Sequence, residues 1–158
     1  MKGIVRCVTL AALLMLAGCG SVEDTGPRSV PQETKQENSG EETTMKMLIG
    51  DTEVTVAWED NDAVDALYEM TAQGSVKIAM ERYGGWEQVG PVGKTLPRQD
   101  AQMTARPGDI MLYSGDQMVV FYGNNSWSYT RLGRITDRSA EELKDLLGQE
   151  DVTVRLER

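Results

Sequence analysis

The segment from Phe121 to Arg134, FYGNNSWSYTRLGR, carries the residue types best suited to binding chemistry. Arg131 follows Tyr129 by two positions, so both side chains would lie on one face of a strand. A guanidinium beside an aromatic ring can grip a carboxylate or stack on another ring. The alternative is that Arg131 pairs at the surface with Asp109 or another acid. Trp127 is the second candidate of this segment, whose other aromatic residues are typical of a packed sheet.

The residues that the chain lacks exclude several kinds of catalysis. There is no histidine, and both cysteines, Cys7 and Cys19, lie near the N-terminus. The rest of the chain therefore has neither the usual general base near neutral pH nor a thiol nucleophile or thiolate metal site. The acidic segment 60–62 lacks the ligand and glycine spacing of a calcium loop. We expect no metal and no cofactor.

The N-terminus has the three parts of a secretory signal. Lys2 and Arg6 give a positive start, residues 8–16 are apolar, and small residues follow. The segment Leu16-Ala17-Gly18-Cys19 resembles the lipobox of bacterial lipoproteins, in which a diacylglycerol is joined to the cysteine sulfur and the chain is cut before it. We expect residues 1–18 to be a signal peptide and Cys19 to be lipidated with chains such as palmitate, which anchors the protein outside the cytoplasm on the bacterial cell membrane. The alternative is an ordinary secreted protein with a chance cysteine.

Composition divides the rest of the chain into a tether and a domain. Residues 19–44 contain no aromatic side chain and are rich in Pro, Gly, Ser, Thr and Glu, so they bury too little apolar surface to fold. We expect a flexible tether there and one folded domain over residues 45–158. With 25 acidic and 16 basic residues the net charge is −9, which opposes nucleic-acid binding. We expect a monomer whose partners are the membrane, through Cys19, and a peptide or small-molecule ligand.

The domain has the pattern of a mainly β fold with two short helices. Alternating apolar residues predict about eight short strands, one of them over residues 52–58, separated by turn residues. Asp60, Asn61 and Asp62 would cap the first helix. Ser139 and Glu142 form a capping box for the second, whose Leu143, Leu146 and Leu147 would face inward. Because a closed barrel leaves no unpaired strand edge, we predict a closed eight-stranded barrel with the helices at its ends.

Five segments form a further pattern through their order and spacing: Ile49-Gly50, Trp58-Glu59-Asp60-Asn61, Tyr83-Gly84-Gly85-Trp86-Glu87, Gly108-Asp109-Ile110-Met111-Leu112-Tyr113 and FYGNNSWSYTRLGRI. Together they resemble the bacterial cyclophilin-like domain family, over roughly residues 45–158. Members of this family are often small stand-alone or lipid-anchored proteins. The resemblance implies a cyclophilin-type eight-stranded barrel with a helix at each end.

The resemblance also implies an activity to be tested. True cyclophilins catalyse prolyl isomerisation, in which an arginine weakens the amide resonance that makes the barrier about 18–20 kcal/mol. Arg82 is a loose positional match for that arginine, and Trp86 and Gln88 follow at nearly the spacing of the family's aromatic residue and glutamine. The histidine that commonly forms the floor of the family's site has no counterpart here.

Our leading hypothesis is therefore an extracytoplasmic, lipid-anchored cyclophilin-like protein that binds a peptide or small ligand without catalysis. The residues predicted to bind this ligand are Arg82, Trp86, Gln88, Tyr122, Trp127 and Arg131. One alternative is a peptidyl-prolyl isomerase that acts on secreted proteins, with Arg82 as its catalytic candidate. The other is a structural envelope lipoprotein that has no ligand.

Overall fold

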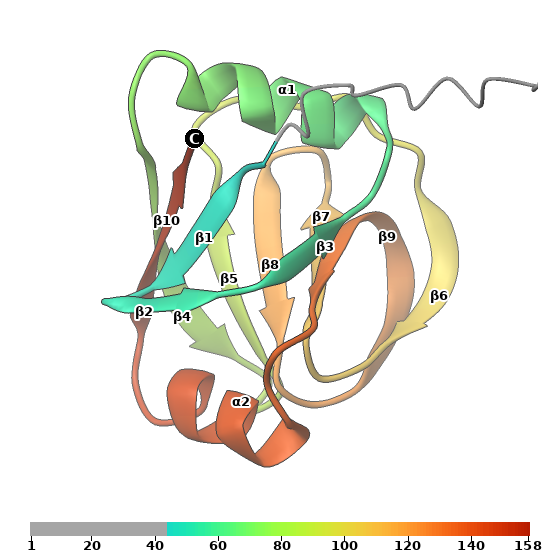
Figure 1. The fold of residues 1–158 in the computed structure, drawn as a ribbon. Coiled ribbons are helices and arrows are strands. Elements are labelled where there is room, and N and C mark those ends of the chain that lie inside the picture. The colour runs from blue at the N-terminus through green and yellow to red at the C-terminus, as the bar shows by residue number, and fades with distance from the viewer. Residues whose placement is uncertain (1–43) are drawn as a thin grey trace, which may run out of the picture. The chain divides into compact units, whose positions relative to one another are not determined.

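Ten strands and two helices make up residues 44–158, the part of the chain that the computed structural model describes (Figure 1). The predicted signal peptide, Cys19 and nearly all of the predicted tether lie outside the described residues. The elements in chain order are β1 (Lys46–Ile49), β2 (Thr52–Val54), β3 (Val56–Trp58), α1 (Asp62–Thr71), β4 (Val76–Tyr83), β5 (Glu87–Pro91), β6 (Ala101–Ala105), β7 (Asp109–Tyr113), β8 (Gln117–Phe121), β9 (Asn125–Ile135), α2 (Ala140–Leu147) and β10 (Val152–Glu157). In this part of the chain no helix is both long and apolar enough to cross a bilayer.

The strands form an antiparallel sheet that curls into a nearly closed barrel. Their hydrogen-bonded order is β2-β1-β10-β4-β5-β8-β7-β9-β3, and β6 pairs with β9 off this path. Although β2 and β3 stand at opposite ends of that order, only Thr55 separates them along the chain. The segment 52–58 therefore joins the two ends of the sheet, pairing with β1 through β2 and with β9 through β3. Few strand edges are left unpaired as a result.

The prediction of a mainly β barrel with two helices is confirmed, but the count of eight strands is slightly low. The segment 52–58, predicted as a single strand, divides at Thr55, where the chain passes from one partner strand to the other. The carbonyl of Thr55 accepts a hydrogen bond from the backbone N–H of Thr136, beyond the end of β9. β6 pairs with β9 alone, so it lies beside the wall of the barrel as an additional strand.

The two helices lie at opposite ends of the barrel, at the top and bottom of Figure 1, and pack on its apolar interior. α1 begins at Asn61, whose side-chain oxygen accepts hydrogen bonds from the backbone N–H groups of Ala63 and Val64. This cap satisfies two of the donors that a helix leaves free at its start. Leu67 of α1 is fully buried against the barrel.

The second helix begins as the sequence predicts. Ser139 accepts a hydrogen bond from the backbone of Glu142, and the Glu142 carboxylate accepts one from the backbone of Ser139, so the capping box is confirmed. Leu143 and Leu147 are buried, whereas Leu146 is only partly buried at the margin of the core.

β7 and β8 carry apolar side chains on both of their faces. Ile110, Leu112, Met118 and Val120 belong to the cluster that fills the barrel. The residues between them belong to a second, smaller cluster on the outer face, which consists of Ala105, Met111, Val119, Phe121 and Tyr129. Continuous apolar runs such as residues 110–113 and 118–122 are typical of strands that are covered on both sides.

The cover on the outer face comes from β6 and the first half of β9. Ile110 pairs with Gly133 and Met111 with Arg131, so β9 holds one extra residue, Leu132, at this point. Such an irregularity bends a strand and increases its twist. The residues of β9 before the irregularity, 125–129, pair with β6. β6 and this half of β9 form a two-stranded ribbon at the right of Figure 1.

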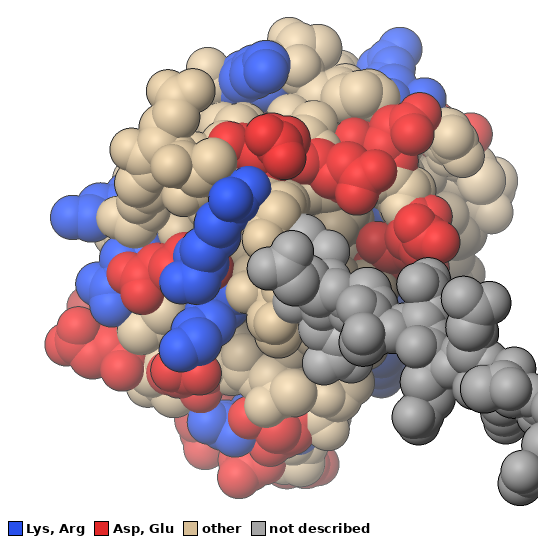
Figure 2. Space-filling view, turned by 45° about the horizontal axis from the view of Figure 1, so that its top comes forward, with Lys and Arg blue, Asp and Glu red and all other residues tan. Residues whose placement is uncertain are grey.

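Charges of both signs share the face that Figure 2 brings forward, which is the top of Figure 1. Acidic side chains form a row across it, and Lys and Arg are interspersed elsewhere. This face therefore presents no continuous basic surface.

Candidate functional site

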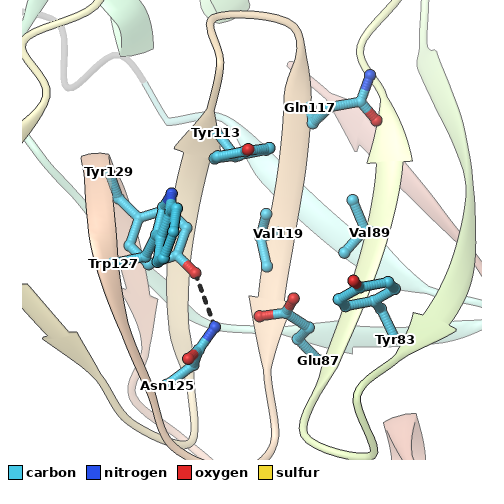
Figure 3. A pocket seen from close by; sticks show the side chains of 9 residues that line it. All are labelled: Tyr83, Glu87, Val89, Tyr113, Gln117, Val119, Asn125, Trp127 and Tyr129. Atoms are coloured by element: carbon cyan, nitrogen blue, oxygen red, sulfur yellow. Dashed lines mark hydrogen bonds between the residues drawn. The ribbon is translucent and has the colours of Figure 1, made fainter.

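A pocket of about 600 Å³ lies on the outer face of the barrel, over β5, β7, β8 and the start of β9 (Figure 3). The strands supply its lining from alternate positions, because successive side chains of a strand point to opposite faces. Val89 stands opposite Val119 across β5 and β8, and Tyr113 stands opposite Gln117 across β7 and β8. The complete lining is Tyr83, Glu87, Val89, Tyr113, Gln117, Val119, Asn125, Trp127 and Tyr129.

Large exposed aromatic side chains surround this pocket. Among the described residues, the large hydrophobic side chains that remain exposed are Tyr83 at 66%, Trp127 at 56% and Tyr113 at 40%. All three line the pocket, although they come from β4, β9 and β7. Figure 3 shows their rings on different sides of the same hollow. A single exposed aromatic residue is ordinary on a protein surface, but a group of them around one concavity indicates a binding site.

Glu87 is the charged residue of the lining, and its carboxylate points into the hollow from β5 (Figure 3). The residue is only 5% exposed, and its Oε2 has no hydrogen-bond partner. Burial raises the pKa of Glu87 above its ordinary value of 4.5, although the neighbouring Asn125 amide and Trp86 indole lower it in part. Neither neighbour donates a well-formed hydrogen bond to Oε2. The pocket thus contains a buried carboxylate whose Oε2 has polar neighbours but no well-aligned hydrogen bond.

Trp86 packs beside Glu87 and is held in place by two glycines. A Cβ atom at Gly84 would lie 2.2 Å from the indole Cζ2, and one at Gly123 would lie 2.6 Å from the Trp86 Cβ. Gly84 also has φ +61°, a conformation that favours glycine. The backbone N–H groups of Tyr122 and Gly123 both donate to the Trp86 carbonyl, at 2.9 Å. The turn between β4 and β5 is therefore built around the indole, whose own Nε1 is buried without a partner.

Tyr129 forms another side of the pocket and is almost fully buried. Its ring makes edge contacts with Phe121, at 5.7 Å between centroids, and with Tyr113, at 6.2 Å. The Asn125 amide donates a hydrogen bond to the Tyr129 hydroxyl over 3.1 Å (Figure 3). Burial, and then the nearby Glu87 carboxylate, raise the pKa of Tyr129 to about 12. The hydroxyl therefore keeps its proton at neutral pH, so it can donate to a bound molecule.

The structure places the predicted site residues in four different environments. Trp127 lines the pocket, whereas Trp86 lies beside Glu87 and packs against the outer cluster without being part of the lining. Tyr122 lies in the cluster that fills the barrel and is 7% exposed. Burial raises the pKa of the Tyr122 phenol, and Arg82 lies close enough to offset part of this rise.

Arg82 and Gln88 contact the chain that follows α2 instead of lining the pocket. The Arg82 guanidinium donates to the Gly148 carbonyl over 3.2 Å. The amide of Gln88, a fully buried residue, donates to the carbonyls of Leu147 and Glu150, each over 2.7 Å. Both side chains satisfy backbone carbonyls near the end of a helix, which is a stabilising role.

Arg131 pairs with Asp109, which is the alternative that the sequence left open for this residue. Its Nη1 donates to Asp109 Oδ1 over 3.0 Å, and Arg134 donates to the same oxygen over 2.7 Å. The backbone N–H of Arg106 donates to the other carboxylate oxygen. Asp109 is only 1% exposed, so this ion pair fixes β9 to β7 close to the irregularity in their pairing. Arg131 is not part of the pocket lining, and neither are Arg82, Gln88 and Tyr122.

Glu87, Tyr83 and Tyr113 were not among the candidate site residues predicted from the sequence, and Tyr129 was assigned to packing. One signal was available, because Glu87 alternates with Val89 and so had to share a face with an apolar residue. Two adjoining apolar runs, at 110–113 and 118–122, also indicated a sheet with two covered faces. The pairing of β5 with β8 places Glu87 beside the apolar run 118–122, and this long-range register cannot be predicted from any local pattern.

Comparisons with known proteins agree with this architecture. The model of a family described as the Cyclophilin-like family matches residues 47–157. Among solved structures, one titled "Structure of McbB in complex with tryptophan" is similar with a TM-score of 0.53 and 14% sequence identity, over 73% of this chain and 44% of McbB. The present chain therefore spans less than half of the McbB chain, and the likeness concerns the fold. A search of curated proteins found no match.

Proposed function

Since the chain belongs to the cyclophilin-like family, we propose that its barrel is a binding module that holds a small organic ligand, or one side chain of a peptide, in the outer pocket. The observation that carries this proposal is the convergence of Tyr83, Tyr113 and Trp127, all exposed, on one concave surface. Ligand sites are typically concave, mostly apolar and supplied with a few directed polar groups. Here the polar groups are Glu87 and the Tyr129 hydroxyl.

The size and chemistry of the pocket suit a ligand with a flat apolar body. A volume of about 600 Å³ lies within the range of roughly 300–1,000 Å³ for small-molecule sites. Covering aromatic surface stabilises a complex by about 25 cal/mol per Å² of apolar area removed from water. McbB, part of which has a similar fold at low sequence identity, has been solved with tryptophan, which makes small aromatic molecules the first ligands to test.

The proposal is tested by ligand-observed NMR titrations of the full-length protein with a panel of small aromatic molecules. We expect binding to be weakened at least tenfold by Tyr113→Ala and by Trp127→Ala. Tyr68→Ala is the matched control, because Tyr68 lies on α1, under the Arg158 guanidinium at 3.9 Å, and is not part of the lining. Absence of binding to the unmodified protein would refute the proposal and favour a structural role. Equal losses in all three variants would place the ligand elsewhere.

We propose further that binding is not accompanied by prolyl isomerisation. The arginine that matches the family's catalytic one, Arg82, directs its guanidinium to the Gly148 carbonyl, and the pocket lining contains no arginine. The expected result is that the protein does not accelerate cis–trans relaxation of a short Xaa-Pro peptide. Acceleration that disappears in Arg82→Ala would establish the alternative activity on secreted proteins.

The proposed place of action is the outer side of the bacterial cell membrane, to which a lipid on Cys19 would hold the protein. Support comes from the sequence of residues 1–19, in which an apolar run precedes Leu16-Ala17-Gly18-Cys19. Growth with a labelled palmitate analogue should label the protein at this position, and Cys19→Ala should abolish the label. Cys7→Ala is the matched control and should change neither label nor processing, because this cysteine falls within the part of the signal that is removed. A native mass that retains residues 1–18 without acyl groups would contradict the proposal.

A further inference from the structure

Glu87 differs from the other deeply buried carboxylate of the domain in having no counter-ion. Asp109, at 1% exposure, receives Arg131 and Arg134 on one oxygen. Glu87 is 5% exposed, and the groups other than burial that affect its pKa, the Asn125 and Trp86 side chains, are uncharged. No Lys or Arg belongs to the lining of the pocket. Buried charges in proteins are normally paired, and Glu87 lines the pocket, so its carboxylate suits a cation that enters the pocket from outside the chain.

A metal ion is a poor candidate for that cation. Metal sites in proteins are built from several ligands, most of them carboxylate, imidazole or thiolate groups, with amide or backbone carbonyls in addition. Over residues 44–158, no group of three or more His, Cys, Asp or Glu side chains lies close enough to hold one. The other polar side chains of the lining are amides and phenols, in Gln117, Asn125 and the three tyrosines. An organic cation needs one carboxylate and no such set.

The aromatic lining gives an independent reason to expect a positive charge. The faces of Tyr and Trp rings carry partial negative charge and attract ammonium or guanidinium groups, by about 0.5–2 kcal/mol for each favourable ring. Tyr83, Tyr113 and Trp127 present their rings around the hollow that the Glu87 carboxylate faces (Figure 3). The net charge of the chain, −9, also draws cations toward the protein.

We infer that the ligand of this pocket carries a positively charged nitrogen, as an ammonium or guanidinium group on an apolar body, and that Glu87 binds this group while the surrounding rings of Tyr83, Tyr113 and Trp127 enclose it. This inference rests on the proposed binding function and names the chemical class of its ligand. A free amine and a basic side chain of a peptide both belong to that class.

The test compares three probes of the same shape and different charge: 2-phenylethylamine, 2-phenylethanol and 3-phenylpropanoate. Affinities for the full-length protein are measured by ligand-observed NMR titration at pH 7. We expect the amine to bind at least tenfold more tightly than the alcohol, and the carboxylate to bind most weakly. Affinities for the amine and the alcohol within twofold of each other would overturn the inference and leave the proposed function standing. If none of the three binds, the proposed function fails and the inference fails with it.

Two variants test whether the Glu87 carboxylate is the charge that favours the amine over the alcohol. Glu87→Gln keeps the size of the side chain and removes its charge, so it should lower affinity for the amine at least tenfold and leave affinity for the alcohol within twofold. Glu141→Gln is the matched control, because Glu141 is an exposed residue of α2, outside the lining of the pocket, and its replacement changes the net charge equally. Equal losses of affinity for the amine in the two variants would mean that net charge alone causes the effect, and would contradict a cation site at Glu87.

Discussion

Replacing Glu87 by glutamine is expected to stabilise the domain at neutral pH. Most substitutions of buried residues destabilise, so the predicted sign is unusual. At neutral pH the carboxylate is buried without a counter-ion, and its Oε2 has no donor. Burying an unpaired charge costs more than burying a neutral polar group of the same shape. Glutamine keeps the shape and removes the charge, so we expect a gain of about 1 kcal/mol in the free energy of unfolding.

The pH dependence of this gain follows from the direction of the pKa shift. Because burial raises the pKa of Glu87 in the folded protein, the folded state binds the proton more tightly than the unfolded state. The contribution of the protonated group is complete below its ordinary value of 4.5 and is lost as the pH rises through the higher, folded-state value. The difference between the variant and the unmodified protein should therefore be small below pH 4.5 and should grow toward neutral pH.

The assay is thermal and urea unfolding of full-length protein and variant at pH 4 and pH 7. For a domain of this size, about 1 kcal/mol shifts the midpoint temperature by roughly 4 °C. Asp109→Asn is the contrasting control, since that carboxylate holds two arginines, and removing one partner of a buried ion pair is strongly destabilising. The arginine side chains are a third to a half exposed, so we expect a loss of about 3 kcal/mol. A Glu87→Gln variant that loses stability at pH 7, as Asp109→Asn does, would refute the view of Glu87 as an unpaired buried charge.

Two further substitutions test the supports of the site and of α2. Gly84→Ala should lower the free energy of unfolding by about 1–3 kcal/mol. It should also shift the fluorescence emission of Trp86, because the new Cβ would overlap the indole. Gly85→Ala is the control: Gly85 also has a positive φ but has open space at its Cβ, so this variant should lose stability without the shift in emission. Emission unchanged in Gly84→Ala would show that the indole is not confined there. Ser139→Ala should lower the free energy of unfolding by about 1 kcal/mol at pH 7. Hydrogen bonds from Ser139, its backbone N–H first, lower the pKa of Glu142, so the stability that this carboxylate contributes is present above pH 4.5 and lost as the pH falls through the lowered value. Glu142→Gln should therefore lose stability at pH 7, and urea titrations in which this loss does not shrink at low pH would contradict the linkage.

The features of the fold that the sequence predicted are those set by neighbours along the chain. The Asn61 and Ser139 caps, the buried faces of both helices and the apolar runs of β7 and β8 each follow from residues within one turn or one strand. The division of the segment 52–58 at Thr55 could not be predicted in this way, because both halves alternate and only their distant partners, β1 and β9, distinguish them.

The candidate site was less accessible to sequence reasoning because it lies on the second face of the sheet. Trp127 was one of the two candidates in the segment 121–134, and it lines the pocket. Glu87 belongs to a motif that the family resemblance already contained, Tyr83-Gly84-Gly85-Trp86-Glu87, but its burial depends on β9 and β6 folding back over the barrel. Arg82 and Gln88 were chosen by position in that resemblance, whereas their hydrogen bonds join them to the chain after α2.

The account depends most on the outer pocket being the place where a ligand binds. The measurement that tests this most directly is a chemical-shift map of isotopically labelled full-length protein during titration with 2-phenylethylamine. The account predicts that the largest changes fall on Glu87, Tyr113 and Val119 and on the indole N–H of Trp127, all of which belong to the lining. Changes concentrated on α1 or α2, with the lining residues unaffected, would contradict it.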